Sequence, residues 1–369
     1  MRRVAFLLAL LMSLPGCASP QRREIHSLAL VMALSLERQQ TGALALTLLV
    51  QGGEEDAGAV YSGTGGSVAE ALSRAEEAIP ARLFFGHTEL ILLDASLWGE
   101  DFLPVLDWFA RSSRLRQECA VALTEEAAGE FLRKSLESPV FLTDALHALW
   151  ENESFYELSR DCQVSRLIAS RKEEAPGFRL PLLRAETAAN GDFVPRCLGY
   201  ALVLDGRAVG RLPESVCGGL RILESSAENL LLSATDSRGA PATAEVHSLR
   251  CQKELLSTDP LRLRIVCEAS LHLSEYRGQA NPMTEEEAAL RAAFEGAMRD
   301  EIGAAIALQR ELSADLMGLA AELSLVDPEA YDALSPHWRE ALETLEADVE
   351  VKAVLLHSQQ LQQPLGGGA

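Results

Sequence analysis

The sequence predicts an α+β fold whose mostly antiparallel sheets are flanked by helices. One reason is that strand-like and helix-like segments alternate irregularly along the chain. A second is Asp205-Gly206, which lies between two short apolar runs and is a strong β-hairpin signal. A third is a long helix expected at 285–311, where apolar residues recur four positions apart on one face. Hairpins mixed with irregularly placed helices favour this class over a doubly wound fold.

Residues 1–16 have the pattern of a lipoprotein signal peptide. Two arginines precede an apolar run at 4–12, and Leu14-Pro15-Gly16-Cys17 follows. The apolar run fits a signal peptide and is too short to span a bilayer, which needs about 20 residues. We expect cleavage after Gly16 and a diacylglyceryl group on the Cys17 thiol, whose two acyl chains give stable anchoring. The alternative is an ordinary secretory signal that contains a cysteine, since Pro15 is unusual at its position.

The charge of the chain bears on its binding partners. Its 369 residues carry a net charge of −21, which becomes −23 once Arg2 and Arg3 are removed with the signal peptide. Such acidity disfavours nucleic acid and repels anionic lipid headgroups. We therefore expect no nucleic-acid partner, and we expect the lipid on Cys17 to hold the protein at a membrane.

The length is sufficient for two or three domains at roughly 100–200 residues each. We place an N-terminal α+β domain at 17–185, a small middle domain at 186–226 and a C-terminal α+β domain at 227–358. The polar segment at 184–196 is expected to be a linker. Residues 359–369 are rich in Gln and Gly and are expected to form a disordered tail.

In the first half, apolar patterning and turn residues predict each element in order. A Ser67–Glu70 capping box marks the start of one helix, and Pro80 marks its end. The expected elements are a hairpin of strands 28–36 and 44–50, helix 68–79, strand 83–93, helix 100–111, strand 118–123, helix 125–134 and a helical stretch at 141–170.

In the second half, strict alternation at 261–273 predicts a strand with one buried face. Asp327-Pro328 predicts the start of a helix. The other expected elements are a hairpin of strands 198–204 and 207–210, a short helix or loop at 213–219, strands 230–234 and 242–251, and a final strand at 349–356.

The residues of the chain form no recognisable catalytic or metal-binding motif. The Gly63–Ser67 loop lacks the lysine of a P-loop, so a simple strand-to-helix turn is the better interpretation. The seven histidines have no metal-ligand spacing, and no G-x-S-x-G precedes a helix. No cysteines form a CxxC motif. Cys251 and Cys267 could pair across a hairpin or remain buried thiols, and the sequence leaves both possibilities open.

Several segments, in order and at matching separations, resemble a known family. They are Arg22-Arg23-Glu24-Ile25 after the lipid cysteine, Phe85-Gly86-His87-Thr88-Glu89, Leu106-Asp107-Trp108-Phe109-Ala110-Arg111 with Arg114-Leu115-Arg116, Leu198-Gly199-Tyr200-Ala201-Leu202, Gln309 with Ala314-Asp315-Leu316-Met317-Gly318-Leu319, and Asp348-Val349-Glu350-Val351. The ordered set resembles the Ger(x)C family of spore germination proteins, the C subunits of nutrient germinant receptors. The resemblance covers nearly all of the chain after Cys17.

The resemblance implies a lipoprotein with three α+β domains on the outer leaflet of the spore inner membrane. It also implies integral-membrane A and B subunits as partners, no enzyme activity, and no cofactor beyond the covalent lipid. Ala18-Ser19-Pro20 stand where the family usually has Trp-Asp, which indicates a divergent member whose partner surfaces can differ.

Seven further positions match the family and have either a structural or a partner-binding interpretation. His87 is expected to pack at the start of a buried strand, and Asp315 to cap a helix near a junction. The remaining positions are Arg23, Glu24, Arg111, Arg116 and Gln309, of which the arginines at 111 and 116 are expected to fix a turn.

The alternative function is that of an extracytoplasmic, lipid-anchored solute-binding protein or enzyme. A solute-binding protein would have two similar α/β lobes around a ligand cleft. An enzyme would need convergent catalytic residues.

Overall fold

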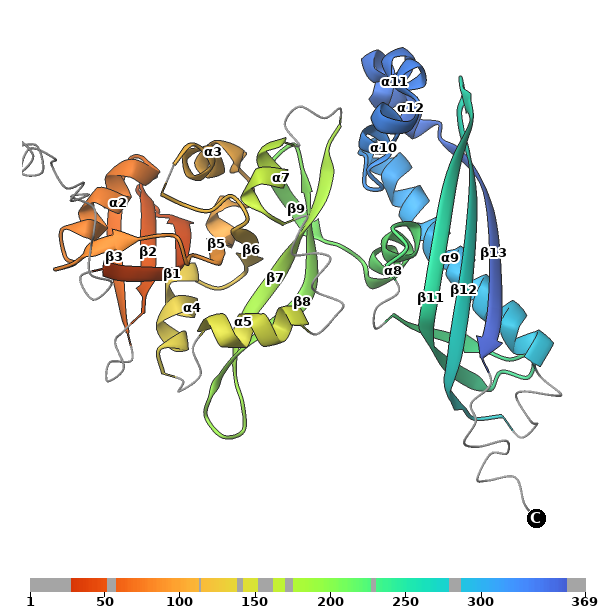
Figure 1. The fold of residues 1–369 in the computed structure, drawn as a ribbon, viewed down its shortest axis with the longest axis horizontal. Helices are drawn as coiled ribbons and strands as arrows, with labels where there is room; N and C mark the ends of the chain where they lie inside the picture. The colour runs from red at the N-terminus through yellow and green to blue at the C-terminus, as the bar shows by residue number, and fades with distance from the viewer. Residues whose placement is uncertain are drawn as a thin grey trace, which may run out of the picture.

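The computed structural model describes residues 28–51, 58–112, 114–137, 142–151, 162–169, 175–226, 230–278 and 287–356. These ranges form two units side by side, each built on one β-sheet with helices (Figure 1). The α+β class expected from the sequence is confirmed. The signal peptide, Cys17 and the expected tail at 359–369 lie outside the described ranges.

The N-terminal unit is built on a nine-stranded sheet with a parallel centre and antiparallel flanks. Strands β1, β5, β6 and β7 run parallel, whereas the outer pairs are hairpin partners. In spatial order the strands are β3 (Ala59–Gly65), β2 (Leu44–Val50), β1 (Leu28–Arg38), β5 (Leu90–Asp94), β6 (Ala120–Thr124), β7 (Gly177–Thr187), β8 (Phe193–Leu204) and β9 (Arg207–Arg211), with β4 (Arg82–Phe84) paired to β1.

Helices cover both faces of this sheet, which is why its central strands are continuously apolar. On β5, Ile91 and Leu93 face one core while Leu90 and Leu92 face the other, and all four are fully buried. Helices α2 (Val68–Glu76), α3 (Leu103–Arg111) and α7 (Val164–Ala169) cover the first face, and α4 (Ala128–Ser135) and α5 (Leu142–Glu151) the second.

The second unit has a four-stranded sheet covered on one face by helices (Figure 1). As expected from the alternation, Leu261, Ile265 and Leu271 are buried on the inner face of β12. Phe294 and Met298 of α9 pack in the same core. The elements are β10 (Leu231–Thr235), β11 (Pro241–Thr258), β12 (Leu261–Tyr276), β13 (Glu346–Leu356), α8 (Glu214–Leu223), α9 (Glu287–Leu312), α10 (Leu319–Val326), α11 (Pro328–Leu334) and α12 (Trp338–Glu343), with short 3₁₀ turns at Ala95–Leu97 and Ser335–His337.

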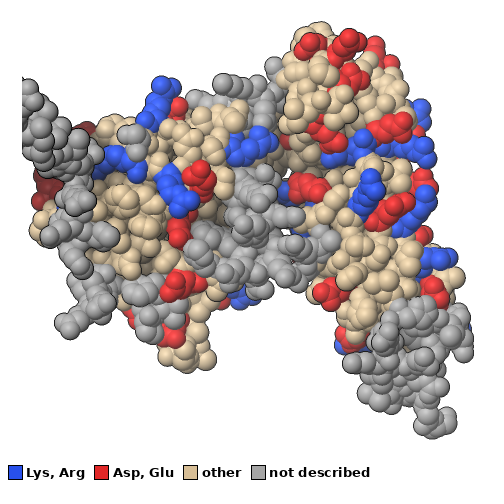
Figure 2. Space-filling view, viewed as in Figure 1, with Lys and Arg blue, Asp and Glu red and all other residues tan. Residues whose placement is uncertain are grey.

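The outer face of this second sheet is charged and exposed. Arg262 pairs with Asp348 across β12 and β13 at 3.0 Å, and Arg264 pairs with Glu350 at 3.3 Å. Lysines and arginines accordingly lie next to acidic residues over this unit (Figure 2). One face of the sheet is therefore core and the other is solvent-facing, as is common for antiparallel sheets.

Local signals in the sequence correctly located several element boundaries. Ser67 Oγ accepts a hydrogen bond from Glu70 N, and the Glu70 carboxylate accepts one from Gly66 N, so the expected capping box begins α2. Asp327 Oδ1 accepts from Ala330 N and caps α11. Asp205-Gly206 forms the β8–β9 turn with both residues at positive φ.

Glycine is required where α2 lies on β3. A Cβ atom at Gly63 would lie 2.1 Å from the Ala71 carbonyl oxygen, and one at Gly65 would lie 2.7 Å from the Ala71 nitrogen. The two glycines let the helix backbone approach the strand directly. The Gly63–Ser67 segment is thus a close-packed strand end and turn.

Three expectations about individual segments were wrong. The strand expected at 83–93 is interrupted, because a turn at Gly86 and His87 separates β4 from β5. His87 therefore lies in an exposed turn and does not begin a buried strand. The segment expected to be a linker at 184–196 is the hairpin between β7 and β8, whose turn uses Gly191 at φ +92°.

The range 186–226 contributes to both units. It supplies the whole β8–β9 hairpin to the first sheet and then helix α8, which packs against α9 of the second unit. Figure 1 places α8 between the two units. The core of the second unit also includes Ala175 and Leu202, which come from the β7–β8 region. The units thus meet through packed side chains, and the division into three domains stays a prediction.

Candidate functional site

The two units meet where the loop between α9 and α10 lies against the start of β7. Asp315 N donates a 2.9 Å hydrogen bond to the Ala175 carbonyl oxygen, and Asp315 forms an isolated β-bridge with Pro176. A Cβ atom at Gly177 would lie 2.6 Å from Leu316 Cδ2. Any side chain at this position would require the Leu316 side chain to move.

Gln309 fixes the conformation of this loop from inside the protein. Its side chain is fully buried, and its Oε1 accepts hydrogen bonds from Leu316 N at 2.9 Å and Met317 N at 3.1 Å. Buried backbone N–H groups need acceptors, and this single amide oxygen serves two of them. The structure therefore places Gln309 in a supporting position under the loop.

Asp315 supplies the cap of α10 from four residues upstream. Its carboxylate accepts from Leu319 N at 2.9 Å and Ala320 N at 2.7 Å. The residue at the usual cap position, Gly318, has φ +69° and no side chain, so the first N–H groups of α10 would otherwise be unpaired. The side chain of Asp315 holds the helix while its backbone contacts the other unit.

An ion pair between a buried arginine and an exposed glutamate also crosses the junction. Arg179 on β7 is 6% exposed and pairs with Glu224 at the end of α8. A buried guanidinium is costly without hydrogen-bonded partners, and the Glu224 carboxylate supplies one of them. This pair links the first sheet directly to the helical layer of the second unit.

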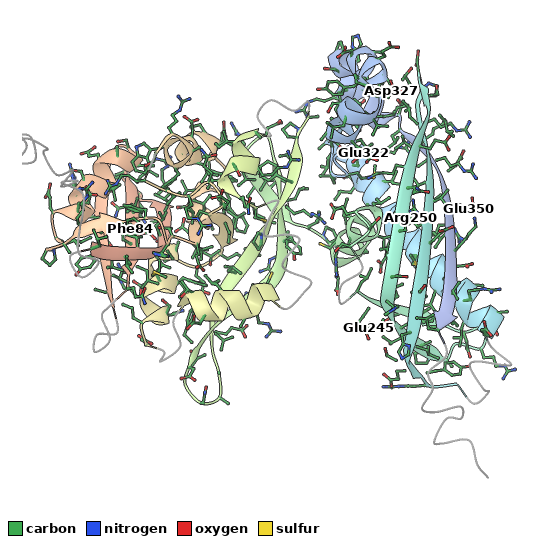
Figure 3. The ribbon with its side chains drawn as sticks, viewed as in Figure 1. Phe84, Glu245, Arg250, Glu322, Asp327 and Glu350 are labelled. Carbon is green, nitrogen blue, oxygen red and sulfur yellow. A yellow bond between two sulfur atoms is a disulfide. The ribbon has the colours of Figure 1, made fainter. Side chains whose placement is uncertain are left out.

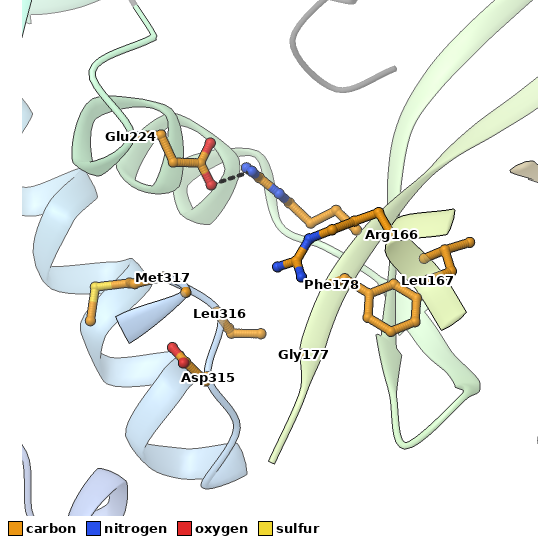
Figure 4. A pocket seen from close by; sticks show the side chains of 10 residues that line it. Arg166, Leu167, Gly177, Phe178, Glu224, Asp315, Leu316 and Met317 are labelled. Carbon is orange, nitrogen blue, oxygen red and sulfur yellow. Dashed lines mark hydrogen bonds and ion pairs between the residues drawn. The ribbon is translucent and has the colours of Figure 1, made fainter. Parts of the chain in front are cut away.

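A cleft of about 200 Å³ lies between these elements (Figure 4). It is lined by Arg166, Leu167, Gly177, Phe178, Arg179, Glu224 and the 315–318 loop. Its walls mix charged and apolar side chains from both units. Because residues of both units line it, this arrangement can fix the position of one unit relative to the other.

Two thiols and a phenol near the junction are poor nucleophiles at neutral pH. Burial raises the pKa of Cys197 and of Cys217 to about 11 each, and burial also raises the pKa of Tyr200. The thiolate is the reactive form of cysteine, so both thiols stay protonated and unreactive near pH 7.

The structure places His87, Arg111 and Arg116 at a separate corner of the N-terminal unit. His87 is exposed and packs against Phe84, with the ring planes tilted and the ring centroids 5.7 Å apart. Arg111 pairs with Asp107 one helical turn away, and Arg116 lies 3.8 Å from Glu118. Both arginines make local, exposed pairs of the kind that contribute little to stability.

The turn that carries His87 and the segment that carries the arginines lie against each other. The Arg114 guanidinium stacks over the Phe85 ring at 4.9 Å and pairs with Glu76. Phe85 and Leu115 line the same small hollow of about 10 Å³. Three of the sequence-predicted residues thus gather at this corner, Gln309 and Asp315 gather at the junction, and Cys17, Arg23 and Glu24 lie outside the described residues.

Sequence reasoning missed Gly177, Arg179 and Glu224. One signal was present for Arg179, because an arginine within the otherwise apolar segment 177–183 needs a carboxylate partner once buried. The partner is 45 residues away in sequence, so no local pattern indicates it.

Cys251 and Cys267 form a disulfide across β11 and β12. They are directly opposite in the antiparallel register, with Cα atoms 4.1 Å apart. This resolves the pairing that the sequence left open. The other described cysteines, at 119, 162, 197 and 217, form no disulfide within the part of the chain that the structure describes.

Within the part of the chain that the structure describes, no group of three or more His, Cys, Asp or Glu side chains is arranged to hold a metal ion. Within the same residues, no helix is long and apolar enough to cross a membrane.

Comparison with family models gives the assignment. Residues 21–185 match the spore germination protein N-terminal domain, and residues 198–359 match the spore germination B3/GerAC-like C-terminal domain. The chain belongs to the Ger(x)C family of spore germination proteins. This confirms the resemblance seen in the sequence, and the two matches together extend across both units of the fold.

Individual Ger(x)C relatives agree with this assignment. The chain is 32% identical over 149 residues to spore germination protein KC of Bacillus subtilis (strain 168). That alignment covers 35% of this chain and 36% of the relative, so the chain spans about a third of the curated relative that it matches. The crystal structure of the GerBC protein matches with a TM-score of 0.55 at 14% identity, covering 88% of this chain and 97% of that one. The latter likeness shows a shared fold.

Proposed function

We propose that this Ger(x)C protein is a lipid-anchored, non-enzymatic subunit of a nutrient germinant receptor complex that acts in spore germination. The match of both family domains, at 21–185 and 198–359, is the observation that carries the proposal. Its partners in the complex would be integral-membrane A and B subunits. Its location would be the outer face of the spore inner membrane.

Lipid anchoring is supported by the sequence around Cys17. A basic start, a short apolar run and Leu14-Pro15-Gly16-Cys17 match what lipid modification requires. A net charge of −21 opposes binding to anionic lipid through the protein surface as a whole. A covalent diacylglyceryl group would supply the attachment that the charge opposes.

A structural role in a complex is supported by the construction of the junction. The residues that converge there make interactions within the protein: Gln309 and Asp315 hold backbone N–H groups, and Arg179 pairs with Glu224. The thiols beside them are held protonated by burial. These groups serve to fix two units into one body that can present surfaces to partners.

Co-purification tests the receptor assignment. A tagged chain isolated from detergent-solubilised spore membranes should bring down polytopic A and B subunits. If the tagged protein is abundant in the membrane fraction but no polytopic partner accompanies it, the assignment to a receptor complex is wrong.

A Cys17→Ala variant, compared with Cys119→Ala as a cysteine control, tests the anchor. The first variant should leave the membrane fraction and impair germination, while the control should not. If Cys17→Ala stays in the membrane fraction at normal levels, the lipid is dispensable.

A further inference from the structure

We propose that β4 and the turn after it, with Arg82, Phe84 and His87 exposed, contact the headgroup region of the membrane. This inference rests on the proposed lipid anchor at Cys17. It adds a second attachment point that would orient the N-terminal unit on the bilayer. The interaction surface is defined by these three side chains.

The position of β4 in the chain is the first argument. β4 pairs in parallel with the first residues of β1, with Leu28 opposite Arg82 and Leu30 opposite Phe84. Leu28 is only 11 positions after Cys17 (28 − 17). Such a segment spans at most about 40 Å when extended, and a flexible one averages about 17–20 Å. An anchored Cys17 would therefore keep this strand edge close to the bilayer surface.

The turn also holds the Phe84 ring outward. Phe84 is 40% exposed, whereas the next residue, Phe85, is 4% exposed in the core. The ring lies directly over Gly86, where a Cβ atom would meet Phe84 Cζ at 2.5 Å, and it packs in a tilted arrangement against the imidazole of His87. These contacts with Gly86 and His87 hold the Phe84 ring in place on the surface. Aromatic rings that are apolar on one side and face water on the other suit the membrane interface.

Arg82 completes the surface with positive charge. It is exposed on the same side of β4 as Phe84, two residues away, and it makes no ion pair with any residue in the described ranges. In a chain of net charge −21, this cation beside an aromatic ring is suited to phosphate headgroups. Phe84 also lies on the side of the N-terminal unit away from the second sheet (Figure 3), so contact there leaves the second unit clear of the bilayer.

Site-specific fluorescence tests the contact. The full lipidated chain carrying Phe84→Cys, labelled with an environment-sensitive fluorophore, is reconstituted into phosphatidylethanolamine–phosphatidylglycerol vesicles. We expect the emission of the fluorophore to shift to the blue on the vesicles. We also expect an aqueous quencher to act several-fold more weakly there than on the same labelled but unlipidated chain in solution without detergent. Arg82→Cys gives a second probe on the same surface. The unsubstituted protein measures labelling of native thiols.

Val354→Cys is the matched control, because Val354 is also apolar and exposed, at 59%, but lies on β13 of the second sheet. Its label should remain fully accessible to the aqueous quencher. Vesicle flotation distinguishes a failure of the lipid anchor from a failure of the membrane contact. If the lipidated protein does not float, the anchor itself is wrong. If it floats while labels at 82 and 84 are quenched as strongly as the label at 354, the membrane contact is wrong and the surface is left for a protein partner.

Discussion

Replacing Gln309 with methionine should destabilise the protein strongly without changing its surface. Methionine is unbranched and similar in size, so it fills the same space. The variant nevertheless removes the acceptor for Leu316 N and Met317 N, which lie in a buried loop. Because those N–H groups cannot reach water without moving the loop, the cost is that of orphaned donors.

The magnitude follows from the number of groups left unpaired. Each buried N–H that loses its partner costs about 1–3 kcal/mol, and two are lost here. Part of this loss of stability is offset, because the substitution also removes Gln309 Nε2, which is buried without a hydrogen-bond partner. We therefore expect the free energy of unfolding to fall by about 2–4 kcal/mol. The Asp315 cap should loosen with the loop, because both act on the same backbone segment.

Urea denaturation followed by far-UV circular dichroism measures the effect. Gln252→Met is the matched control, since Gln252 is exposed on β11 and its loss should change stability by no more than about 0.5 kcal/mol. If Gln309→Met unfolds at the same urea concentration as the control, the loop does not depend on this amide. If it is stable but no longer co-purifies with receptor subunits, Gln309 is a partner contact and the structural account fails.

Other predictions concern the junction, the disulfide and pH. Gly177→Ala should displace the Leu316 side chain, loosen the junction and so raise protease sensitivity between the units, whereas Gly99→Ala should not, because a Cβ at Gly99 meets open space and its φ is not positive; equal digestion rates would contradict this. Non-reducing peptide mapping should recover Cys251 and Cys267 in one linked pair, and their joint replacement by alanine should lower stability by up to about 3 kcal/mol for a loop of this length. Burial and the neighbouring Asp94 carboxylate raise the pKa of Glu37, so the folded state binds this proton more tightly and loses stability as pH rises through that pKa. Glu37→Gln should therefore raise the melting temperature more at pH 7 than at pH 4, and an equal change at both would refute the linkage.

The sequence predicted those elements whose signals are local. The α2 capping box, the Asp205-Gly206 hairpin and the alternating face of β12 each depend on residues within a few positions of one another. The turn at Gly86 and His87 was missed because apolar residues continue on both sides of it. A strand buried on both faces is continuously apolar, so no change in an alternating pattern marks where it begins. The 184–196 hairpin was missed because its polar residues resemble those of a linker.

The junction was beyond sequence reasoning for a different reason. Gln309 and Asp315 were singled out only by position in a family pattern, and nothing local shows that the loop they hold contacts Ala175, 140 residues before Asp315. Cys251 and Cys267 were placed opposite each other by the hairpin around residue 259, but spacing alone does not set the register. Long-range contacts of this kind appear only when the chain is folded.

The junction and the proposed membrane contact have a joint consequence. If β4 rests on the bilayer and the loop held by Gln309 fixes the second unit to the first, the second sheet has a defined orientation relative to the membrane. Its outer face carries exposed pairs such as Arg262 with Asp348, which contribute little to stability. Such pairs can be exchanged for pairs with a partner at little cost to the fold. A charge reversal at Arg262 should therefore weaken co-purification with receptor subunits while leaving the melting temperature nearly unchanged.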